Sequence, residues 1–234
     1  MAESISDLTE DAQSLQLTMQ THKDELVTKG FKDTRFQDFS DALNAVIKKS
    51  STQTAAQSTM VQSTDDQNSA IKDAIAIAAK VQNAARSAFG KNKPKMKEFK
   101  VGTRKTRSVS QLSQLLDYLA GVCTKYHDEL VENGMTADDF ADLSSAYATL
   151  VTTDAVQEHS KKLRNVATDT RDDSVASLKD QMFKVRSFAK SAFAGNKALL
   201  EEFKPIKRGG KRGAATPPPP VPEPVTAQPA QPSK

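Results

Sequence analysis

Residues 31–89 read FKDTRFQDFSDALNAVIKKSSTQTAAQSTMVQSTDDQNSAIKDAIAIAAKVQNAARSAF, a run of 59 residues without a glycine or a proline. A second run of the same length covers residues 135–193. Glycine and proline mark most turns, and strands need turns far more often than these two runs allow. The runs therefore predict an all-α protein.

Both runs belong to an internal duplication with a period of 104 residues. Residues 4–100 align with residues 108–204 without a gap, and the alignment gives 27 identities over 97 positions. Roughly six identities would be expected for unrelated chains of similar composition. The chain is therefore predicted to consist of two tandem copies of one module.

The first helix of each copy is predicted from an apolar heptad, which runs from Leu8 to Leu26 and again from Leu112 to Leu130. Its N-cap is expected at Ser6 or Asp7 in the first copy and at Ser110 in the second. Gly30 and Gly134 follow these helices and suit the left-handed residue that commonly ends a helix.

A second helix is predicted to begin near Asp33 or Thr34, and near Thr136 in the other copy, and a third to end at residues 89 and 193. The only signal between them is the pair Thr64-Asp65, repeated as Thr168-Asp169, which can cap a new helix. A break there gives two helices of about 25 residues, which match the first helix in an antiparallel three-helix bundle. The alternative is one continuous helix of roughly 56 residues, about 84 Å long. The break is the favoured prediction.

Each copy closes with a short amphipathic segment, in which Met96 and Phe99, or Leu200 and Phe203, are predicted to plug the end of the bundle. Beyond Ile206 the composition becomes rich in Gly, Pro, Ala and Gln, which cannot build a core. The predicted organisation is helical module 1 at 1–102, a basic linker at 103–107, helical module 2 at 108–206 and a disordered basic, Pro-rich tail at 207–234.

Charge is segregated along the chain. Residues 91–107 carry a net charge of +7 and residues 204–234 a net charge of +5, whereas the whole chain has only +4, so the remainder carries −8. Basic segments of this kind can bind phosphate backbones, dock on acidic helices, or simply complement helix C-termini. The candidate polyanion-binding residues are Lys91, Lys93, Lys95, Lys97, Arg104, Lys105, Arg107, Lys207, Arg208, Lys211 and Arg212.

No catalytic, cofactor-binding or metal-ligating residue is predicted. The single cysteine, Cys123, has His127 one helical turn away, but it lies on the core heptad where the first copy has Met19. It is therefore interpreted as a core residue. The histidines are scattered, and no glycine motif has the form of a phosphate-binding loop.

The start of the chain has no basic and apolar leader, and no window approaches 18 apolar residues, so we expect a soluble cytoplasmic protein. The favoured function is a non-enzymatic helical scaffold or protein-interaction protein. The alternative is sequence-independent binding of nucleic acid or another polyanion through the basic module ends and tail; an enzyme is the third hypothesis. The expected partners are another protein, a second copy of this chain or nucleic acid, with no membrane and no small molecule.

Overall fold

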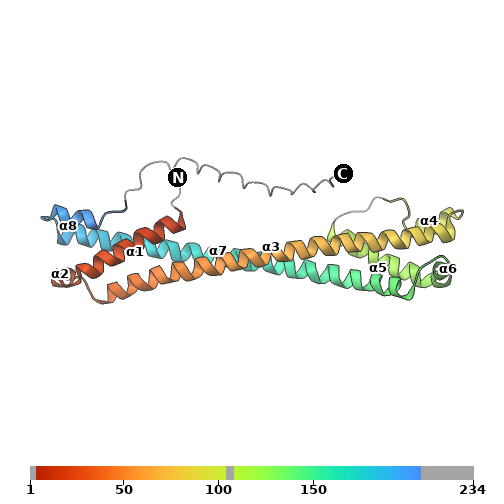
Figure 1. The fold of residues 1–234 in the computed structure, drawn as a ribbon, viewed down its shortest axis with the longest axis horizontal. Helices are drawn as coiled ribbons and strands as arrows, with labels where there is room; N and C mark the ends of the chain where they lie inside the picture. Colours follow the sequence, from red (N-terminus) through yellow and green to blue (C-terminus); the bar gives the residue numbers. More distant parts are fainter. Residues whose placement is uncertain (1–3, 104–107, 207–234) are drawn as a thin grey trace, which may run out of the picture.

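The computed structural model describes residues 4–103 and 108–206, and these residues form α-helices and their connections without a strand. Figure 1 shows a long rod in which two helices run the full length and shorter helices gather at each end. The helices are α1 (Ile5–Thr21), α2 (Lys23–Thr28), α3 (Thr34–Phe89), α4 (Lys93–Glu98), α5 (Val109–Lys125), α6 (His127–Glu132), α7 (Ala137–Ala192) and α8 (Lys197–Glu202).

The favoured break inside each copy is wrong, because α3 and α7 are continuous helices of 56 residues each. At 1.5 Å per residue, each is about 84 Å long. The two residues expected to cap a new helix instead bond within the existing one. Thr64 Oγ1 donates to the carbonyl of Met60 at 2.8 Å, and Thr168 Oγ1 donates to that of Arg164 at 2.9 Å. A threonine hydroxyl satisfied in this way lets the helix continue.

Several predicted boundaries are confirmed. Gly30 and Gly134 have φ values of 96° and 95° in the left-handed region. Thr136 caps α7 through a capping box with Asp139, and α3 begins at Thr34. The first helix differs from the prediction.

The first helix of each copy has its N-cap at Ser4 or Ser108, one turn or less before the expected residues. A kink at His22 separates α1 from α2, and a kink at Tyr126 separates α5 from α6.

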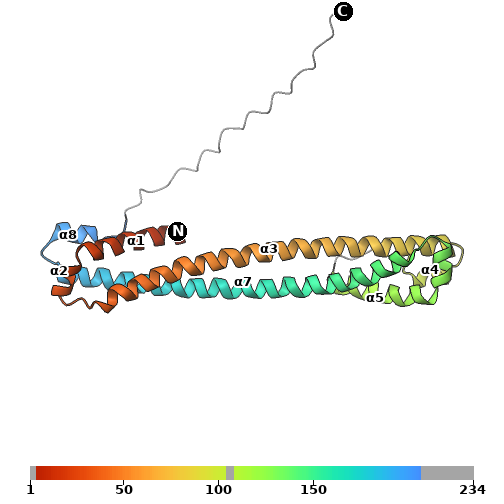
Figure 2. The ribbon, with the colours of Figure 1, turned by 60° about the horizontal axis from the view of Figure 1, so that its bottom comes forward.

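The long helices pair in antiparallel orientation. Gln67 of α3 bonds to Asp154 of α7 at 2.7 Å, and further along α3 Lys80 pairs with Asp139, which lies earlier in α7. Because of this pairing, the second half of α3 lies beside the first half of α7, far from α1 of its own copy (Figure 2).

The structure therefore has two cores, and each core draws on both copies. Bundle A contains α1, α2, α8, residues 34–46 of α3 and residues 175–192 of α7. Bundle B contains α4, α5, α6, residues 70–89 of α3 and residues 137–150 of α7. The expectation that each copy closes its own three-helix bundle is thus wrong. A continuous helix carries its C-terminal apolar stripe away from its own first helix, and that stripe is buried against the first helix of the other copy.

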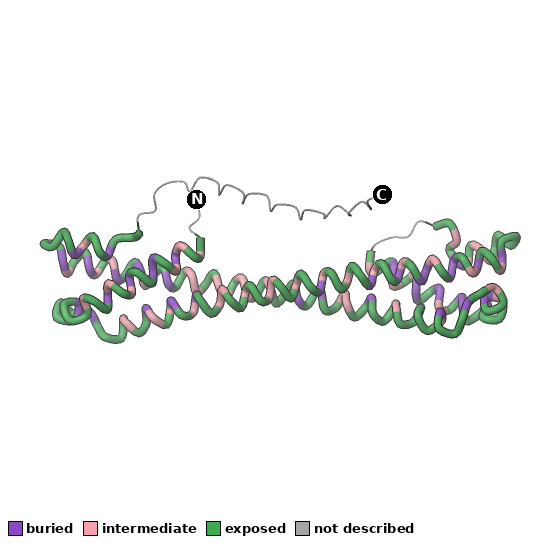
Figure 3. The backbone as a smooth tube through the Cα atoms, in the orientation of Figure 1, coloured by how far each residue is buried: buried purple, intermediate pink, exposed green. Residues whose placement is uncertain are grey.

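Between the bundles lies a waist, residues 50–69 of α3 and 154–173 of α7, to which the described residues contribute the two long helices alone. The heptad persists there but becomes polar, and the side chains that remain buried include Ser63, Gln157 and Ser160. Figure 3 shows buried residues concentrated at the two ends and sparse between them. Successive heptad positions read Phe39, Val46, Gln53, Met60, Gln67, Ala74 and Val81 on α3, and Leu143, Leu150, Gln157, Arg164, Arg171, Leu178 and Val185 on α7.

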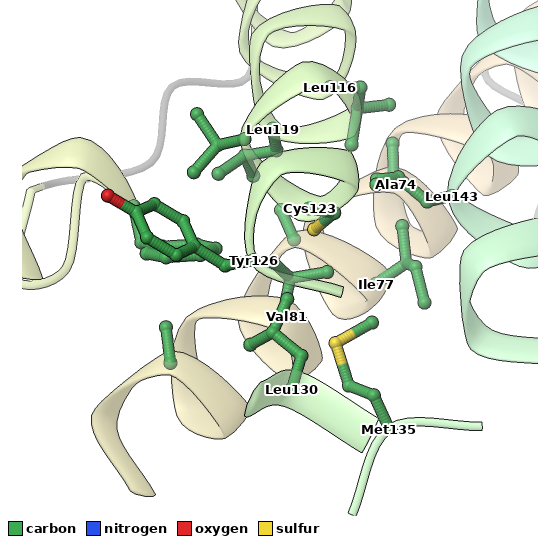
Figure 4. Close-up of a cluster of buried hydrophobic side chains, with 14 of the residues drawn as sticks. Ala74, Ile77, Val81, Leu116, Leu119, Cys123, Tyr126, Leu130, Met135 and Leu143 are labelled. Carbon is green, nitrogen blue, oxygen red and sulfur yellow. The ribbon is translucent and has the colours of Figure 1, made fainter. Parts of the chain in front are cut away.

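The predicted aromatic plugs are present at both ends. Phe99 is buried and stacks on Phe89 with ring centroids 5.7 Å apart, while Phe203 stacks on Phe193 at 6.0 Å. Figure 4 shows the centre of bundle B, where Cys123 lies among aliphatic side chains and Tyr126. The prediction that Cys123 is a core residue is confirmed.

Candidate interaction sites at the two ends

The same turn joins the end of each long helix to the short helix that follows it. The N–H of Asn92 donates to the carbonyl of Phe89 at 2.7 Å, and the N–H of Asn196 donates to that of Phe193 at 2.8 Å. Each asparagine side chain then caps its short helix, accepting from the N–H of Lys95 at 3.2 Å or of Leu199 at 3.1 Å. Asn is a preferred N-cap residue, so the two copies fold this corner alike.

Three cations occupy equivalent positions around this corner in both copies. Each set has one residue on the last turns of the long helix, one at the start of the short helix and one just after it, and all six side chains are exposed. Aligned by the 104-residue period, the pairs are Arg86 and Lys190, Lys93 and Lys197, and Lys100 and Lys204.

In bundle A these cations border a groove of about 510 Å³ between α7 and α8. Leu200, Phe203 and Pro205 supply its apolar surface, and Lys190 and Lys197 lie at its rim. Within the described residues these two lysines have no ion pair, whereas Lys204 is paired with Glu201. The groove therefore combines an apolar floor with uncompensated positive charge.

The two corners differ in how the long helix holds the chain after the short helix. In bundle A, Arg186 Nε donates to the carbonyl of Phe203 at 3.0 Å. In bundle B, Gln82 takes the same position, and its Nε2 donates to the carbonyls of Phe99 at 3.2 Å and Lys100 at 2.9 Å. The two corners also differ in charge, because Lys97 of bundle B and Glu201 of bundle A occupy equivalent positions.

The structure assigns different roles to the lysines of α4 and the residues before it. Lys91, Lys93 and Lys97 are exposed. Lys95 is half-buried, with its Nζ 4.5 Å from the ring centroid of Phe89 and 4.6 Å from that of Tyr126, and 3.5 Å from Glu129 Oε1. Cation–π contacts of this kind stabilise the bundle, so the ammonium group of Lys95 is already engaged by residues of bundle B. The other predicted cations lie outside the described residues: Arg104, Lys105, Arg107, Lys207, Arg208, Lys211 and Arg212.

The residues that flank the basic linker and tail lie at opposite ends of the rod. Thr103 Oγ1 donates to the carbonyl of Lys100 in bundle B, and the carbonyl of Ser108 accepts the N–H of Leu112 at the start of α5 in the same bundle. The N–H of Ile206 donates to Asp11 of bundle A at 3.1 Å. The residues on both sides of the linker therefore lie in bundle B, and the residue before the tail lies in bundle A.

Sequence reasoning missed Arg86, Lys190 and Lys197 as site residues. Arg86 and Lys190 lie on the long helices, and only the turn after each long helix brings them beside the short helix that begins at Lys93 or Lys197. The available signal was the recurrence of positive charge at positions 104 residues apart.

The structure also places the residues that were considered for catalysis and metal binding. Burial raises the pKa of the Cys123 thiol to about 11, so it is protonated at neutral pH. His127 is exposed, stacks on Phe140 and lies 3.1 Å from Asp128 Oδ1. Across residues 4–103 and 108–206, no three His, Cys, Asp or Glu side chains are placed to hold a metal ion. The helices of the same residues include none that is long and apolar enough to cross a membrane.

Comparison of the chain with protein-family models, with curated proteins and with solved structures found no match.

Proposed function

We propose that this protein is a non-enzymatic helical scaffold that holds two like protein-binding ends a set distance apart. The observation that carries the proposal is the placement of bundles A and B, built from the same duplicated elements, at opposite ends of two paired 56-residue helices. A continuous helix has a fixed rise per residue, so it holds two binding surfaces at its ends a constant distance apart.

The two tips also present matching exposed side chains. Val27 of α2 and Val131 of α6 occupy equivalent positions and are 39% and 44% exposed. A protein that recognises one tip should therefore find a related surface at the other. In the part of the chain that the structure describes, the polar waist consists of α3 and α7 without a short helix beside them.

The scaffold proposal is tested by photocrosslinking from full-length protein in its native extract. p-Benzoylphenylalanine is placed at Val27, at Val131 or at Val61, which is exposed at the waist. The expected result is that both tips crosslink to the same partner protein and that the waist does not. Crosslinks confined to the waist, or unrelated proteins at the two tips, would contradict the proposal.

A second candidate function is binding of a polyanion such as nucleic acid. It is favoured by the exposure of Lys91, Lys93 and Lys97 beside the net positive linker. Such binding should weaken steeply with salt, because each neutralised phosphate releases counterions. A salt titration with duplex DNA and single-stranded RNA, comparing full-length protein with a form that ends at Lys204, measures this directly.

Alanine substitution of the linker residues Arg104, Lys105 and Arg107 separates the two candidates. A scaffold should retain its captured partner in this variant. A polyanion-binding protein should lose affinity for nucleic acid. Absence of nucleic-acid binding at low salt by both forms would rule the second candidate out.

A further inference from the structure

We infer that the groove between α7 and α8 binds an acidic peptide segment that carries an apolar side chain, and that the equivalent corner between α3 and α4 binds a second such segment. The inference rests on the proposed scaffold function and names the chemistry that its ends recognise. It follows from three features: the charge at the rim of the bundle A groove, the apolar side chains on its floor, and the recurrence of the three cations and the buried phenylalanine at the corner of bundle B.

The rim selects for negative charge. Lys190 and Lys197 border the groove of bundle A without an ion pair within the described residues, and Lys204 adds a third cation, which Glu201 partly compensates. In bundle B the equivalent residues are Arg86, Lys93 and Lys100; Lys100 is already engaged, with its Nζ 5.2 Å from the ring centroid of Tyr118, so Arg86 and Lys93 carry the available charge there. Positive charge that the fold itself leaves unpaired is available to a partner, and complementary charge sets both the rate and the specificity of association.

The floor distinguishes a peptide from a nucleic acid. Leu200 and Pro205 offer aliphatic surface to a ligand, while Phe203 is 3% exposed and already stacked on Phe193. Phosphate contacts would use the lysines alone and leave the apolar floor without a partner, and a base could stack only on an exposed aromatic face, which the buried Phe203 does not offer. A leucine or phenylalanine side chain flanked by carboxylates matches an aliphatic floor bordered by lysines.

The repetition predicts two sites per chain. The turns, caps and plugs that shape the corners are the same in both copies, so the three cations are held in related positions. Figure 1 shows α8 and α4 at opposite ends of the rod. Two partner segments can therefore bind at once without crossing the rod.

The grooves are also predicted to differ in affinity. Glu201 lies in the groove of bundle A, whereas Lys97 takes its place in bundle B. The corner of bundle B is therefore expected to be the tighter site for an acidic ligand. Glu201→Lys should raise the affinity of the bundle A groove toward that of bundle B.

The test uses full-length protein and a fluorescein-labelled peptide in which single leucines are separated by pairs of glutamates. Calorimetry should give two sites per chain. The variant K190E/K197E/K204E and the variant R86E/K93E/K100E should each retain one site, and the combined variant should bind at least tenfold more weakly. The control K48E/K72E/K162E reverses three exposed lysines on the long helices outside the grooves and should change the affinity less than twofold. Circular dichroism confirms that each variant is folded.

Two further probes test the class of ligand. A peptide with serine in place of leucine should bind at least fivefold more weakly, because it cannot use the floor. Equal binding of the two peptides, or an equal loss in the control variant, would overturn the inference, as would tighter groove-dependent binding of duplex DNA or of phosphatidylserine vesicles. Failure of the peptide to bind, with photocrosslinks from both tips intact, would overturn this inference while leaving the scaffold function in place.

Discussion

Arg186 of α7 holds Asp11 of α1 through two hydrogen bonds of 2.9 Å, donated by Nη2 to both carboxylate oxygens. The same carboxylate accepts the N–H of Ile206, and the same guanidinium holds the carbonyl of Phe203. Arg186 and Asp11 thus join the first helix, the last long helix and the end of the described chain. In bundle B the equivalent residues are Gln82 and Leu115, which cannot form an ion pair.

The first prediction uses bundle B as a template for bundle A. Arg186→Gln or Asp11→Leu alone should each destabilise the protein by about 1–3 kcal/mol, because each leaves a buried polar partner without its hydrogen bonds. The double variant should lose less than the sum, since it reproduces the pair Gln82 and Leu115. Urea unfolding of the four proteins measures the coupling. Strictly additive losses would show that the two residues act independently.

The second prediction concerns the first copy alone. In residues 1–103, the stripe that contains Ala74, Ile77 and Val81 loses α5, against which it packs in the whole protein. Burial of such a stripe contributes about 25 cal/mol per Å² of apolar surface, so we expect two such fragments to pair with each other through α3. Sedimentation equilibrium should find a dimer. A folded monomer with cooperative unfolding would contradict the interleaved packing.

The third prediction concerns the waist. Gln157 Oε1 and Arg164 Nε are buried without a hydrogen-bond partner among the described residues, and few apolar side chains are buried near them. Segments with little apolar burial open at lower free energy than cores. Amide hydrogens of residues 50–69 and 154–173 should therefore exchange faster than those of residues 70–89, as followed by mass spectrometry. Equal protection along α3 would show that the waist is as stable as the bundles.

The fourth prediction concerns acid. Lys80 bonds to the carboxylate of Asp139, and the backbone N–H of Thr136 donates to it at 2.9 Å; both lower the pKa of Asp139. A carboxylate with a lowered folded pKa contributes stability that is present above its unfolded pKa of about 3.9 and is lost as pH falls through the folded value. Asp139→Asn should be less stable than the parent at pH 7, and its stability should fall less on acidification.

Urea midpoints at neutral pH and near pH 3 measure this difference. The matched control is Asp138→Asn, an exposed residue of the same first turn, which should behave like the parent. Some acid sensitivity should persist in both variants, because Lys125 and Tyr126 also lower the pKa of Glu98. An identical pH dependence of D139N and the parent would contradict the role of Asp139.

The fifth prediction concerns the single thiol. Cys123 is buried in bundle B, and its raised pKa leaves almost no thiolate at neutral pH. Alkylation of the folded protein by iodoacetamide should therefore be at least a hundredfold slower than alkylation in urea. Fast reaction in the folded state, followed by mass spectrometry, would show that the thiol is accessible.

The helices, their glycine ends and their aromatic plugs could be predicted from the sequence because local signals determine them. Heptad spacing marks the stripe from Leu112 to Leu130, and the left-handed conformation selects Gly30 and Gly134. The continuity of α3 could not be predicted in this way. Thr64 can either cap a new helix or bond backward within one, and the choice depends on where the stripe of residues 70–89 is buried.

The groove residues show the same limit at the level of the site. The sequence indicates Lys93 and Lys97 because they belong to a basic run. It does not indicate Arg86 and Lys190, because each comes beside the short helix only through the turn that follows the long helix. Local charge density identified the basic segment but not the groove.

The interleaved cores make the chain equivalent to a symmetric dimer whose subunits have become covalently joined. In a dimer of identical subunits, any substitution appears at both ends. Here each end can change by itself, and the pair Arg186 and Asp11 at one end, with Gln82 and Leu115 at the other, records such independent change. Fusion thus gives one polypeptide two ends of common origin that can acquire different preferences while their number and separation stay constant.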